Sequence, residues 1–416
     1  MATDWVRVPI SELCSAIVDC VNKTAPTVER PTPYRMIRTT NVKGGFIDVS
    51  SVRYVTEETY KIWTRRQIPR RGDIVLTREA PLGEVGLLRD DEGIFLGQRL
   101  VSYRVDPKKA DNRFLLYALL SPDLQSQIQG LGAGATVAHM RVPDAERLSV
   151  LAPPLYLQQR IGSILSAYDD LIEVNRRRVA VLEEMARRLF EEWFVQFRFP
   201  CADGARRLPV GLPTGWSMVK LSDVCSAITR GIAPKYDDSS RSLVISQKCI
   251  RGQRLDLGPA RRQSKPAPVE KLVRPGDVLI NSTGVGTLGR VAQVEEVPGG
   301  TTVDSHVTIV RAGPSLQVDY FGMAMQRLQP VFESMGAGAT GQTELNRGRV
   351  AGIEIALPQA AVQTAFGEAV RPMRILVHRL LEQNGKLSDA RDLLLPRLIS
   401  GELSLTAAER ELEAVA

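Results

Sequence analysis

Two sets of polar residues stand at corresponding places in the two halves of the sequence. The first-half residues are Arg38, Thr39, Thr40, Asn41, Thr77, Arg78 and Glu79, and the second-half residues are Ser246, Gln247, Lys248, Asn281, Ser282 and Thr283. In the DNA major groove arginine pairs with guanine, asparagine or glutamine with adenine, and glutamate with cytosine, whereas serine, threonine and lysine hold phosphates. These residue types are suited to reading DNA, although an ordinary solvated loop would contain several of them.

A glycine motif, Gly284-Val-Gly-Thr-Leu-Gly289, matches the GxGxxG pattern of dinucleotide sites. Such a site needs a helix after the third glycine, whereas residues 290–294 (RVAQV) have the pattern of a strand, so we do not expect a nucleotide site. The acidic pairs at 90–91 and 237–238 lie in glycine- or serine-rich sequence that is typical of solvated turns. The three histidines and five cysteines lack metal-ligand spacing. We therefore expect no catalytic residue, no metal and no cofactor in this chain.

The chain has 416 residues, enough for two or three domains with cores of their own. Its 44% hydrophobic and 24% charged residues are typical of a globular protein, and we identify neither a membrane span nor a signal peptide. A cytoplasmic location is therefore expected. The net charge of +7 permits a polyanionic partner, and the surplus falls in two separate blocks, +3 in residues 1–157 and +5 in residues 201–357.

An internal repeat extends over most of the sequence. Segments from the first half return in the same order in the second: 5–17 as 216–228, 37–48 as 245–256, 70–76 as 274–280, and Gly132-Ala-Gly-Ala-Thr136 as 336–340. Four ordered matches indicate a duplication. Short runs of Val, Ile and Leu between turn residues predict strands in each copy, and residues 113–129 and 319–333 have helical spacing. The expected fold class is α+β, with two duplicated α/β domains.

Each copy is followed by a long segment in which apolar residues step by four and three, as in a coiled coil. The first series is Ile161, Leu165, Tyr168, Ile172, Asn175, Val179, Leu182, Ala186, Leu189 and Trp193, and the second is Phe366, Val370, Met373, Val377, Leu380, Asn384, Leu387, Arg391, Leu394 and Leu398. We expect two antiparallel helices related by a pseudo-twofold axis, with ordinary core packing as the alternative. Pro372 and Gly385 predict a kink or frayed turn in the second helix.

Four aromatic residues crowd the end of the first helix, namely Phe190, Trp193, Phe194 and Phe197. They exceed what one helical seam can bury, so we interpret them as a subunit interface. Packing against the adjacent domain is the alternative.

The order of these parts resembles the specificity subunit of type I restriction-modification systems. The segments that carry the resemblance are Arg38–Asn41, Leu76–Ala80, Ala186–Trp193 and Leu394–Leu403, and the likeness extends over nearly the whole chain. It implies two target-recognition domains, residues 1–157 and 201–358, conserved spacer helices at 158–200 and 359–403, and an acidic tail at 404–416. It also implies a non-catalytic subunit that binds a split sequence in double-stranded DNA.

The resemblance further implies two methyltransferase (modification) subunits docked on the helices, joined by restriction subunits. S-adenosylmethionine, ATP and Mg²⁺ would be bound by these partners. To the polar residues named above it adds Gln98 and Arg99 in the first domain and His306 in the second as DNA-binding residues. The comparison of the two copies adds His139, which differs from its counterpart in the second copy. A coiled-coil scaffold or adaptor whose globular blocks bind protein is the alternative function.

Overall fold

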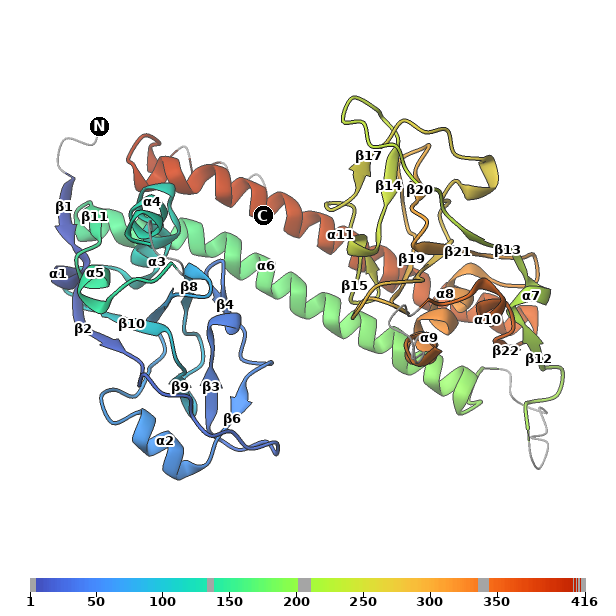
Figure 1. Cartoon of the computed structure of the whole chain (residues 1–416), viewed down its shortest axis with the longest axis horizontal. Coiled ribbons are helices and arrows are strands. Elements are labelled where there is room, and N and C mark those ends of the chain that lie inside the picture. The colour runs from blue at the N-terminus through green and yellow to red at the C-terminus, as the bar shows by residue number, and fades with distance from the viewer. Residues whose placement is uncertain are drawn as a thin grey trace. The chain divides into compact units, whose positions relative to one another are not determined.

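The structure, a computed structural model, describes residues 5–132, 138–200, 211–335 and 344–406, together with residues 408, 410 and 412. The chain forms two compact units (Figure 1). Unit 1 combines Met1–Asn175 with Glu382–Ala416, and unit 2 is Arg176–Leu381. Apart from Gly132, the repeated Gly-Ala-Gly-Ala-Thr segments lie outside the described residues.

Unit 1 begins with a mixed α/β domain. Its elements are β1 (Val6–Pro9), α1 (Ile10–Leu13), β2 (Cys14–Asp19), β3 (Arg35–Ile37), the 3-10 turn η1 (Thr39–Asn41), β4 (Val42–Lys43), β5 (Phe46–Ile47), β6 (Arg53–Tyr54), α2 (Glu57–Trp63), β7 (Ile74–Arg78), β8 (Leu82–Leu87), β9 (Ile94–Leu96), β10 (Leu100–Val105), α3 (Asn112–Leu120), α4 (Pro122–Leu131), α5 (Val142–Glu146) and β11 (Ser149–Ala152). The long helix α6 (Leu155–Phe190) follows and ends in a π turn, η2 (Glu191–Val195).

The domain of unit 2 has a matching order of elements. They are β12 (Ser217–Lys220), α7 (Leu221–Val224), β13 (Cys225–Arg230), β14 (Leu243–Ile245), η3 (Gln247–Cys249), β15 (Ile250–Arg251), β16 (Arg254–Leu255), β17 (Arg261–Arg262), η4 (Val269–Lys271), β18 (Val278–Asn281), β19 (Val291–Gln293), β20 (Thr302–Val303), β21 (Val307–Ala312), α8 (Val318–Arg327), α9 (Gln329–Met335), α10 (Arg347–Ala351) and β22 (Glu354–Leu357). The second long helix is α11 (Ala360–Ile399).

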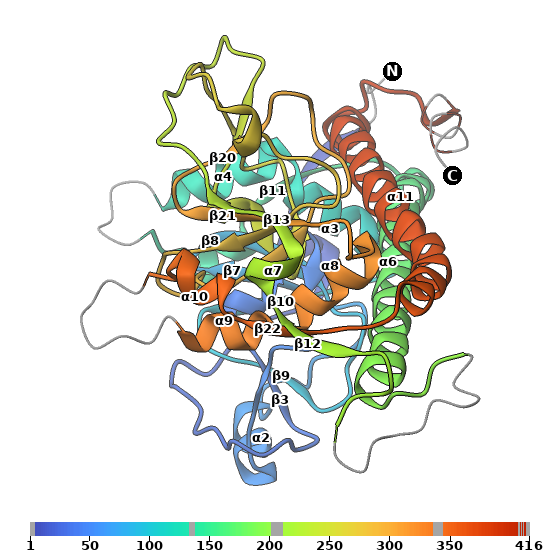
Figure 2. The same cartoon turned by 90° about the vertical axis from the view of Figure 1, so that its right-hand side faces the viewer.

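The two domains share one sheet topology, which confirms the duplication and the α+β class. A four-stranded antiparallel sheet has the order β2-β10-β7-β8 in unit 1 and β13-β21-β18-β19 in unit 2. A three-stranded sheet, β6-β3-β9 or β17-β14-β20, lies beside it, and its middle strand pairs with one parallel and one antiparallel neighbour. In unit 2 the helix α8 lies between the larger sheet and the long helices (Figure 2).

An ion pair with a buried aspartate lies at the same point of the four-stranded sheet in each domain. Arg104 on β10 pairs with Asp73 at 2.7 Å, and Arg311 on β21 pairs with Asp277 at 2.7 Å. The aspartate side chains are only 3% and 1% exposed. Each aspartate also accepts a backbone hydrogen bond three residues upstream, so its charge is well compensated inside the fold.

The predicted helical stretch 113–129 is two helices in the structure. Ser121 ends α3 and caps α4, because its hydroxyl accepts a hydrogen bond from the Leu124 N–H, and Pro122 occupies the first helical position. The stretch 319–333 divides in the same way into α8 and α9. Helical spacing predicted these elements but did not locate the breaks between them.

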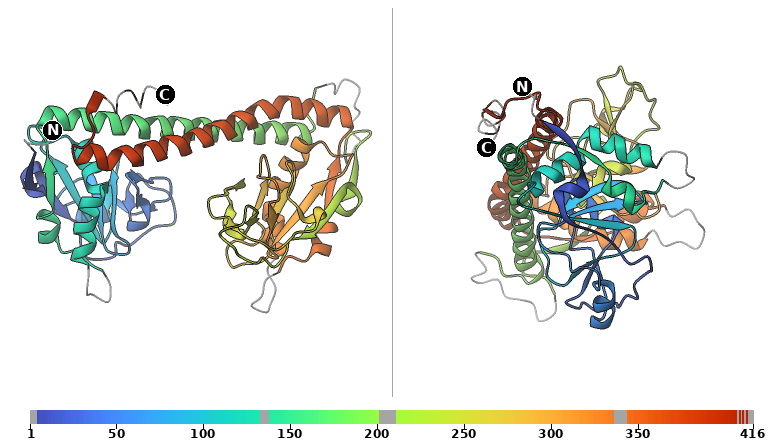
Figure 3. Two further views of the ribbon diagram at one scale, coloured as in Figure 1. Left: turned by 90° about the horizontal axis from the view of Figure 1, so that it is seen from above. Right: turned by 90° about the vertical axis from the view of Figure 1, so that its left-hand side faces the viewer.

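The two long helices pack against each other within each unit, and they run antiparallel there (Figure 3). In unit 1 the Asn175 amide donates to Asn384 at 3.0 Å and to Gln383 at 3.1 Å, while Arg391 pairs with Asp169 further along. All the seam residues predicted from the sequence are buried or half-buried.

The frayed turn, one of the two alternatives predicted for α11, is wrong, since the helix is continuous from Ala360 to Ile399 through Pro372 and Gly385, whereas a kink stays a prediction. A proline removes one helical hydrogen bond, but Val370 and Leu380 on either side of it are buried and keep the helix in place. Asn384 therefore does not mark a break, and Arg391 is accommodated on the seam by its ion pair with Asp169.

The interpretation of the aromatic cluster as a subunit interface is wrong for three of its four members. Phe190, Trp193 and Phe194 are 6%, 8% and 6% exposed and belong to the core of unit 2. The ring of Phe194 lies 4.6 Å from that of Tyr320 and 4.9 Å from that of Phe366. Phe197 is half-buried and meets the ring of Trp216 edge-on. The apolar side chains at the end of this helix are therefore buried within their own unit, which is the alternative stated above.

Candidate nucleic-acid interface

In unit 1 three loop segments meet where β7 ends and β10 begins. The Arg78 N–H donates to the Arg99 carbonyl at 2.8 Å, and the Met140 N–H donates to the Arg78 carbonyl at 2.9 Å. Glu79 then lies between two basic side chains, with Arg99 Nε at 2.8 Å and His139 Nδ1 at 3.5 Å. We refer to Glu79, Arg99 and His139 as cluster 1. Arg99 and His139 are exposed and Glu79 is half-buried.

Unit 2 repeats this backbone frame with other side chains. The Ser282 N–H donates to the His306 carbonyl at 2.8 Å, and the Leu345 N–H donates to the Ser282 carbonyl at 2.8 Å. Thr283 Oγ1 lies 2.8 Å from His306 Nδ1 and accepts a hydrogen bond from the Gln247 amide at 2.6 Å. We refer to Gln247, Thr283 and His306 as cluster 2. It is built from hydrogen bonds between groups that need carry no charge, whereas cluster 1 centres on a carboxylate.

Four of the residues predicted to read DNA are buried and make hydrogen bonds inside the domains. Asn41 accepts from the Arg38 N–H and donates to Asp48 and Ser51, so it stabilises the turn of η1.

Thr77 likewise donates to the Pro81 carbonyl and accepts from the Glu84 N–H. Asn281 donates to the Gln247 carbonyl, and the Ser282 hydroxyl pairs with that of Thr308. Because all four are at most 2% exposed, assigning their side chains to base contacts is wrong for this conformation.

Of the other predicted residues, Gln98, Ser246 and Lys248 are sequence neighbours of cluster residues, and Arg38, Thr39 and Thr40 lie in or beside η1. Thr40 and Lys248 are exposed at equivalent places in η1 and η3, while Thr39 and Ser246 are half-buried. Gln98 is half-buried and accepts a hydrogen bond from Thr24 at 3.2 Å. The Arg38 guanidinium donates to the Ser51 carbonyl. The structure therefore does not show which of these side chains would contact a base.

The glycine motif of the second domain forms a turn before a strand. Residues 291–293 are β19, which confirms the prediction of a strand in place of the helix that a dinucleotide site needs. Gly289 has a φ of +81°, and a Cβ there would lie 2.5 Å from the Glu333 N. The motif is therefore explained by a tight turn against α9.

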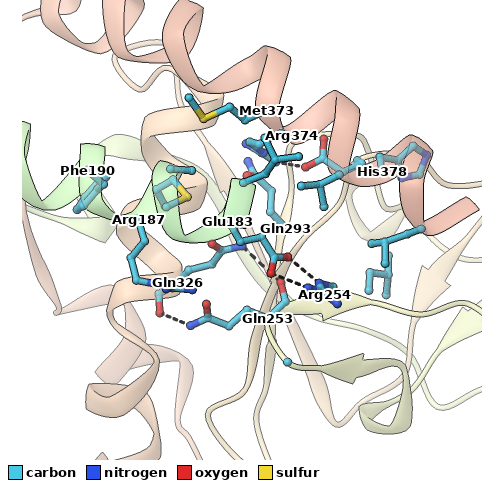
Figure 4. A pocket seen from close by; sticks show the side chains of 18 of the residues that line it. Glu183, Arg187, Phe190, Gln253, Arg254, Gln293, Gln326, Met373, Arg374 and His378 are labelled. Carbon is cyan, nitrogen blue, oxygen red and sulfur yellow. Dashed lines mark hydrogen bonds and ion pairs between the residues drawn. The ribbon is translucent and has the colours of Figure 1, made fainter. Parts of the chain in front are cut away.

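A cavity of about 460 Å³ lies in unit 2 between α6, α11, α8 and the β15–β16 hairpin (Figure 4). Its charged lining is engaged within the unit: Arg254 pairs with Glu183, and Arg374 pairs with Glu295. The Gln253 amide donates to the Gln326 carbonyl at 3.0 Å. These polar side chains therefore bind to one another and connect the long helices to the domain of unit 2.

The titratable groups of the described residues do not form a metal-binding cluster of histidine, cysteine and carboxylate side chains. Cys14 and Cys225 occupy the same place at the start of β2 and β13, and burial raises the pKa of each thiol to about 12. Thiols with such a pKa stay protonated and unreactive, in agreement with a structural role. Cys201 lies outside the described residues.

Sequence reasoning missed Arg230, the last residue of β13. Its guanidinium donates to the Leu345 carbonyl at 2.8 Å and pairs with Glu344, next to cluster 2. The corresponding residue of the first copy is Asp19, so the repeat gave no signal for an arginine here.

The comparisons with known proteins agree with this architecture. A family model described as the type I restriction modification DNA specificity domain matches residues 3–184. The chain is 24% identical over 368 residues to the type I restriction enzyme MjaIX specificity subunit of Methanocaldococcus jannaschii, covering 84% of this chain and 82% of that protein. Residues 3–184 thus match the model of that specificity domain, and most of the chain is similar to a type I restriction enzyme specificity subunit.

Two further comparisons extend the family match. The type I restriction enzyme HindI specificity subunit of Haemophilus influenzae is 22% identical over 365 residues, which cover 70% of this chain and 77% of that protein. The crystal structure of the type I restriction-modification system S subunit from M. genitalium superposes with a TM-score of 0.58 at 17% identity, over 95% of this chain and 96% of that one. The latter likeness shows that the chain has the fold of a specificity subunit. Within the described part of the chain, no helix has the length and apolar composition that a membrane crossing requires.

Proposed function

We propose that each domain reads one half of a bipartite, asymmetric sequence in double-stranded DNA. The observation that carries this proposal is the pairing of one backbone frame with two different sets of side chains. Cluster 1 combines a guanidinium, an imidazole and a carboxylate, whereas cluster 2 combines an amide, a hydroxyl and an imidazole. Since these groups prefer different base edges, one half-site could not satisfy both domains.

We also propose that this chain is the non-catalytic subunit of its complex. Two modification subunits would dock on α6 and α11 and methylate adenine with S-adenosylmethionine, and restriction subunits would use ATP and Mg²⁺. In this proposal the helices also set the spacing of the half-sites. Support comes from the relatives named above, which are specificity subunits of type I restriction enzymes.

The test is to co-express the chain with the methyltransferase encoded beside it and to map methylated adenines by single-molecule sequencing. One bipartite motif is expected. Replacing residues 211–357 by the second domain of a relative should change only one half of that motif, and replacing residues 5–152 should change only the other.

A co-purified complex that methylates no site would overturn the proposal. In that case a coiled-coil scaffold whose globular domains bind protein would be the better account of the chain.

A further inference from the structure

A guanidinium lies at the same place in both domains, although it comes from different strands. In unit 1 it belongs to Arg78, the last residue of β7, and its Nη1 donates to the Met140 carbonyl at 3.4 Å. In unit 2 it belongs to Arg230, the last residue of β13, and its Nη2 donates to the Leu345 carbonyl at 2.8 Å. Met140 and Leu345 occupy equivalent positions. The Met140 N–H donates to the carbonyl of Arg78 at the end of β7, and the Leu345 N–H donates to the carbonyl of Ser282 directly after β18.

The sequence repeat does not account for this arrangement. Arg78 corresponds to Ser282, whose hydroxyl is occupied by Thr308, and Arg230 corresponds to Asp19, which pairs with Arg66. Each copy has therefore lost or never had the arginine of the other copy. Both domains therefore have a guanidinium beside the equivalent carbonyl, but non-equivalent residues supply it.

The donors of these guanidinium groups are incompletely used. Arg78 is only 8% exposed, its Nε is buried without a hydrogen-bond partner, and no carboxylate among the described residues forms an ion pair with it. The neighbouring Glu79 is already engaged by Arg99 and His139. Arg230 also has a buried Nε without a partner, but its charge is balanced by Glu344.

A largely buried guanidinium with unused N–H groups is unfavourable unless an acceptor arrives. The two exposed members of cluster 1 lie next to Arg78 along the backbone. The Arg99 carbonyl accepts from the Arg78 N–H, and His139 precedes Met140, whose N–H donates to the Arg78 carbonyl. An acceptor of nucleic acid held at cluster 1 would meet Arg78 at its exposed edge. Glu344, with a side chain 56% exposed, stands in the corresponding place beside Arg230.

We propose that Arg78 and Arg230 are equivalent acceptor-binding residues for duplex DNA, one in each domain. This inference rests on the proposed function. The acceptor is either a phosphate oxygen or the O6 and N7 of guanine, both of which suit a guanidinium. Arg78 has no carboxylate partner among the described residues to displace, whereas Arg230 is released from Glu344 when the acceptor replaces the carboxylate.

The test uses the full chain in complex with its methyltransferase and duplexes selected from a random-sequence pool. If Arg78 contacts a base, Arg78→Gln should reduce the preference at one base pair of the first half-site by about 5- to 150-fold and leave the second half-site unchanged. If it contacts a phosphate, affinity should fall for every duplex, and the log–log salt slope should decrease by about 0.9. Arg230→Gln should act in the same way on the second half-site.

Two further variants guard against a merely structural effect. Arg78→Lys keeps the charge, so it should keep the salt slope in either case and lose base preference only if the fork reads guanine. Glu344→Gln should strengthen binding, because it removes the competitor for Arg230. Arg66→Gln is the matched control, since it removes an exposed arginine of the same domain that pairs with Asp19.

Unchanged affinity and preference in folded Arg78→Gln and Arg230→Gln would overturn this inference. A parent complex that binds no duplex at any salt concentration would instead overturn the proposed function, so the two failures are distinguishable.

Discussion

Clusters 1 and 2 occupy equivalent positions but stabilise their loops by different forces. Cluster 1 gathers two basic side chains around the carboxylate of Glu79, whereas cluster 2 links Gln247, Thr283 and His306 by hydrogen bonds. The backbone hydrogen bonds beneath them are the same to within 0.1 Å, at 2.8 and 2.9 Å in unit 1 and 2.8 Å twice in unit 2. The comparison teaches that the frame and the side chains it presents can change independently.

The helices differ between the units in a similar way. In unit 1 the seam contains a polar layer of Asn175, Gln383 and Asn384. The repeat places Leu380 and Val179 at the positions equivalent to Asn175 and Asn384, and both are buried in unit 2. A polar layer costs stability but favours one register of a helix pair. The register of the helices is therefore specified more strongly in unit 1.

The largest expected effect tests what the two units share. Asp73→Ala should lower the free energy of unfolding of unit 1 by about 2–3 kcal/mol, and Asp277→Ala should do the same for unit 2, because each leaves a half-buried arginine without its partner and removes the acceptor for a backbone N–H. Hydrogen exchange during urea unfolding, resolved by peptide, would measure each unit separately. Asp123→Ala, which removes an exposed ion pair with Arg7, should cost at most about 1 kcal/mol. Equal destabilisation of both units by either variant would show that they do not unfold independently.

The polar layer gives the next effect. Asn175→Ala should destabilise unit 1 by about 1 kcal/mol, since it leaves the half-buried amide oxygen of Asn384 without its donor. Asn175→Leu combined with Asn384→Leu should restore most of that loss, because both polar partners are replaced together. Urea unfolding followed by circular dichroism would measure both. A double variant less stable than Asn175→Ala would contradict the assignment of the layer to register.

The two clusters should respond differently to salt. Arg99→Ala should weaken DNA binding several-fold and reduce the log–log salt slope by up to about 0.9, because it removes an exposed cation. His306→Ala, measured at pH 8, should weaken binding without changing the slope. Fluorescence anisotropy over a range of salt concentrations would separate the two. Equal slopes for both variants would remove the electrostatic distinction between the clusters.

The smallest effect concerns pH. Burial raises the pKa of Asp304 above its ordinary value of 3.8, so the folded unit 2 binds this proton more tightly than the unfolded chain does. Its stability should therefore fall as pH rises from 3.8 through the raised pKa, and Asp304→Asn should remove that decrease while keeping the acceptor for the His306 N–H. Unit 1 has Gly97 at the equivalent position, whose N–H donates to Ile37 as that of Asp304 donates to Ile245. Thermal unfolding between pH 3 and pH 7 is the measurement, and an unchanged pH dependence would contradict it.

Much of the fold follows from the spacing of residue types along the chain. The duplication, the strands around Gly-Asp and the two long helices depend on patterns that persist over many residues, and the structure contains all of them. The continuity of α11 through Pro372 was not predictable in the same way. It depends on how strongly the flanking turns are buried, which is a property of the whole unit.

The candidate site was predicted less well, for a physical reason. Asn41 and Thr77 have side chains that can pair with bases or with their own backbone, and only the fold decides between the two. The aromatic residues at the end of α6 were misassigned because their partners, such as Tyr320 and Phe366, are far away in the sequence. Arg230 was missed because the equivalent guanidinium of unit 1 comes from another strand.

The composition of unit 1 has a consequence for the order in which the protein is made. Its hydrophobic core includes Leu387, Leu394 and Leu398 from the end of α11, packed with the domain that is translated first. Because a ribosome delivers those residues after unit 2, the first domain waits with an open apolar face while unit 2 can already close on itself. A chain truncated before Glu382 therefore exposes the apolar surface that proteases and chaperones recognise, and a stable first domain requires synthesis through Leu398.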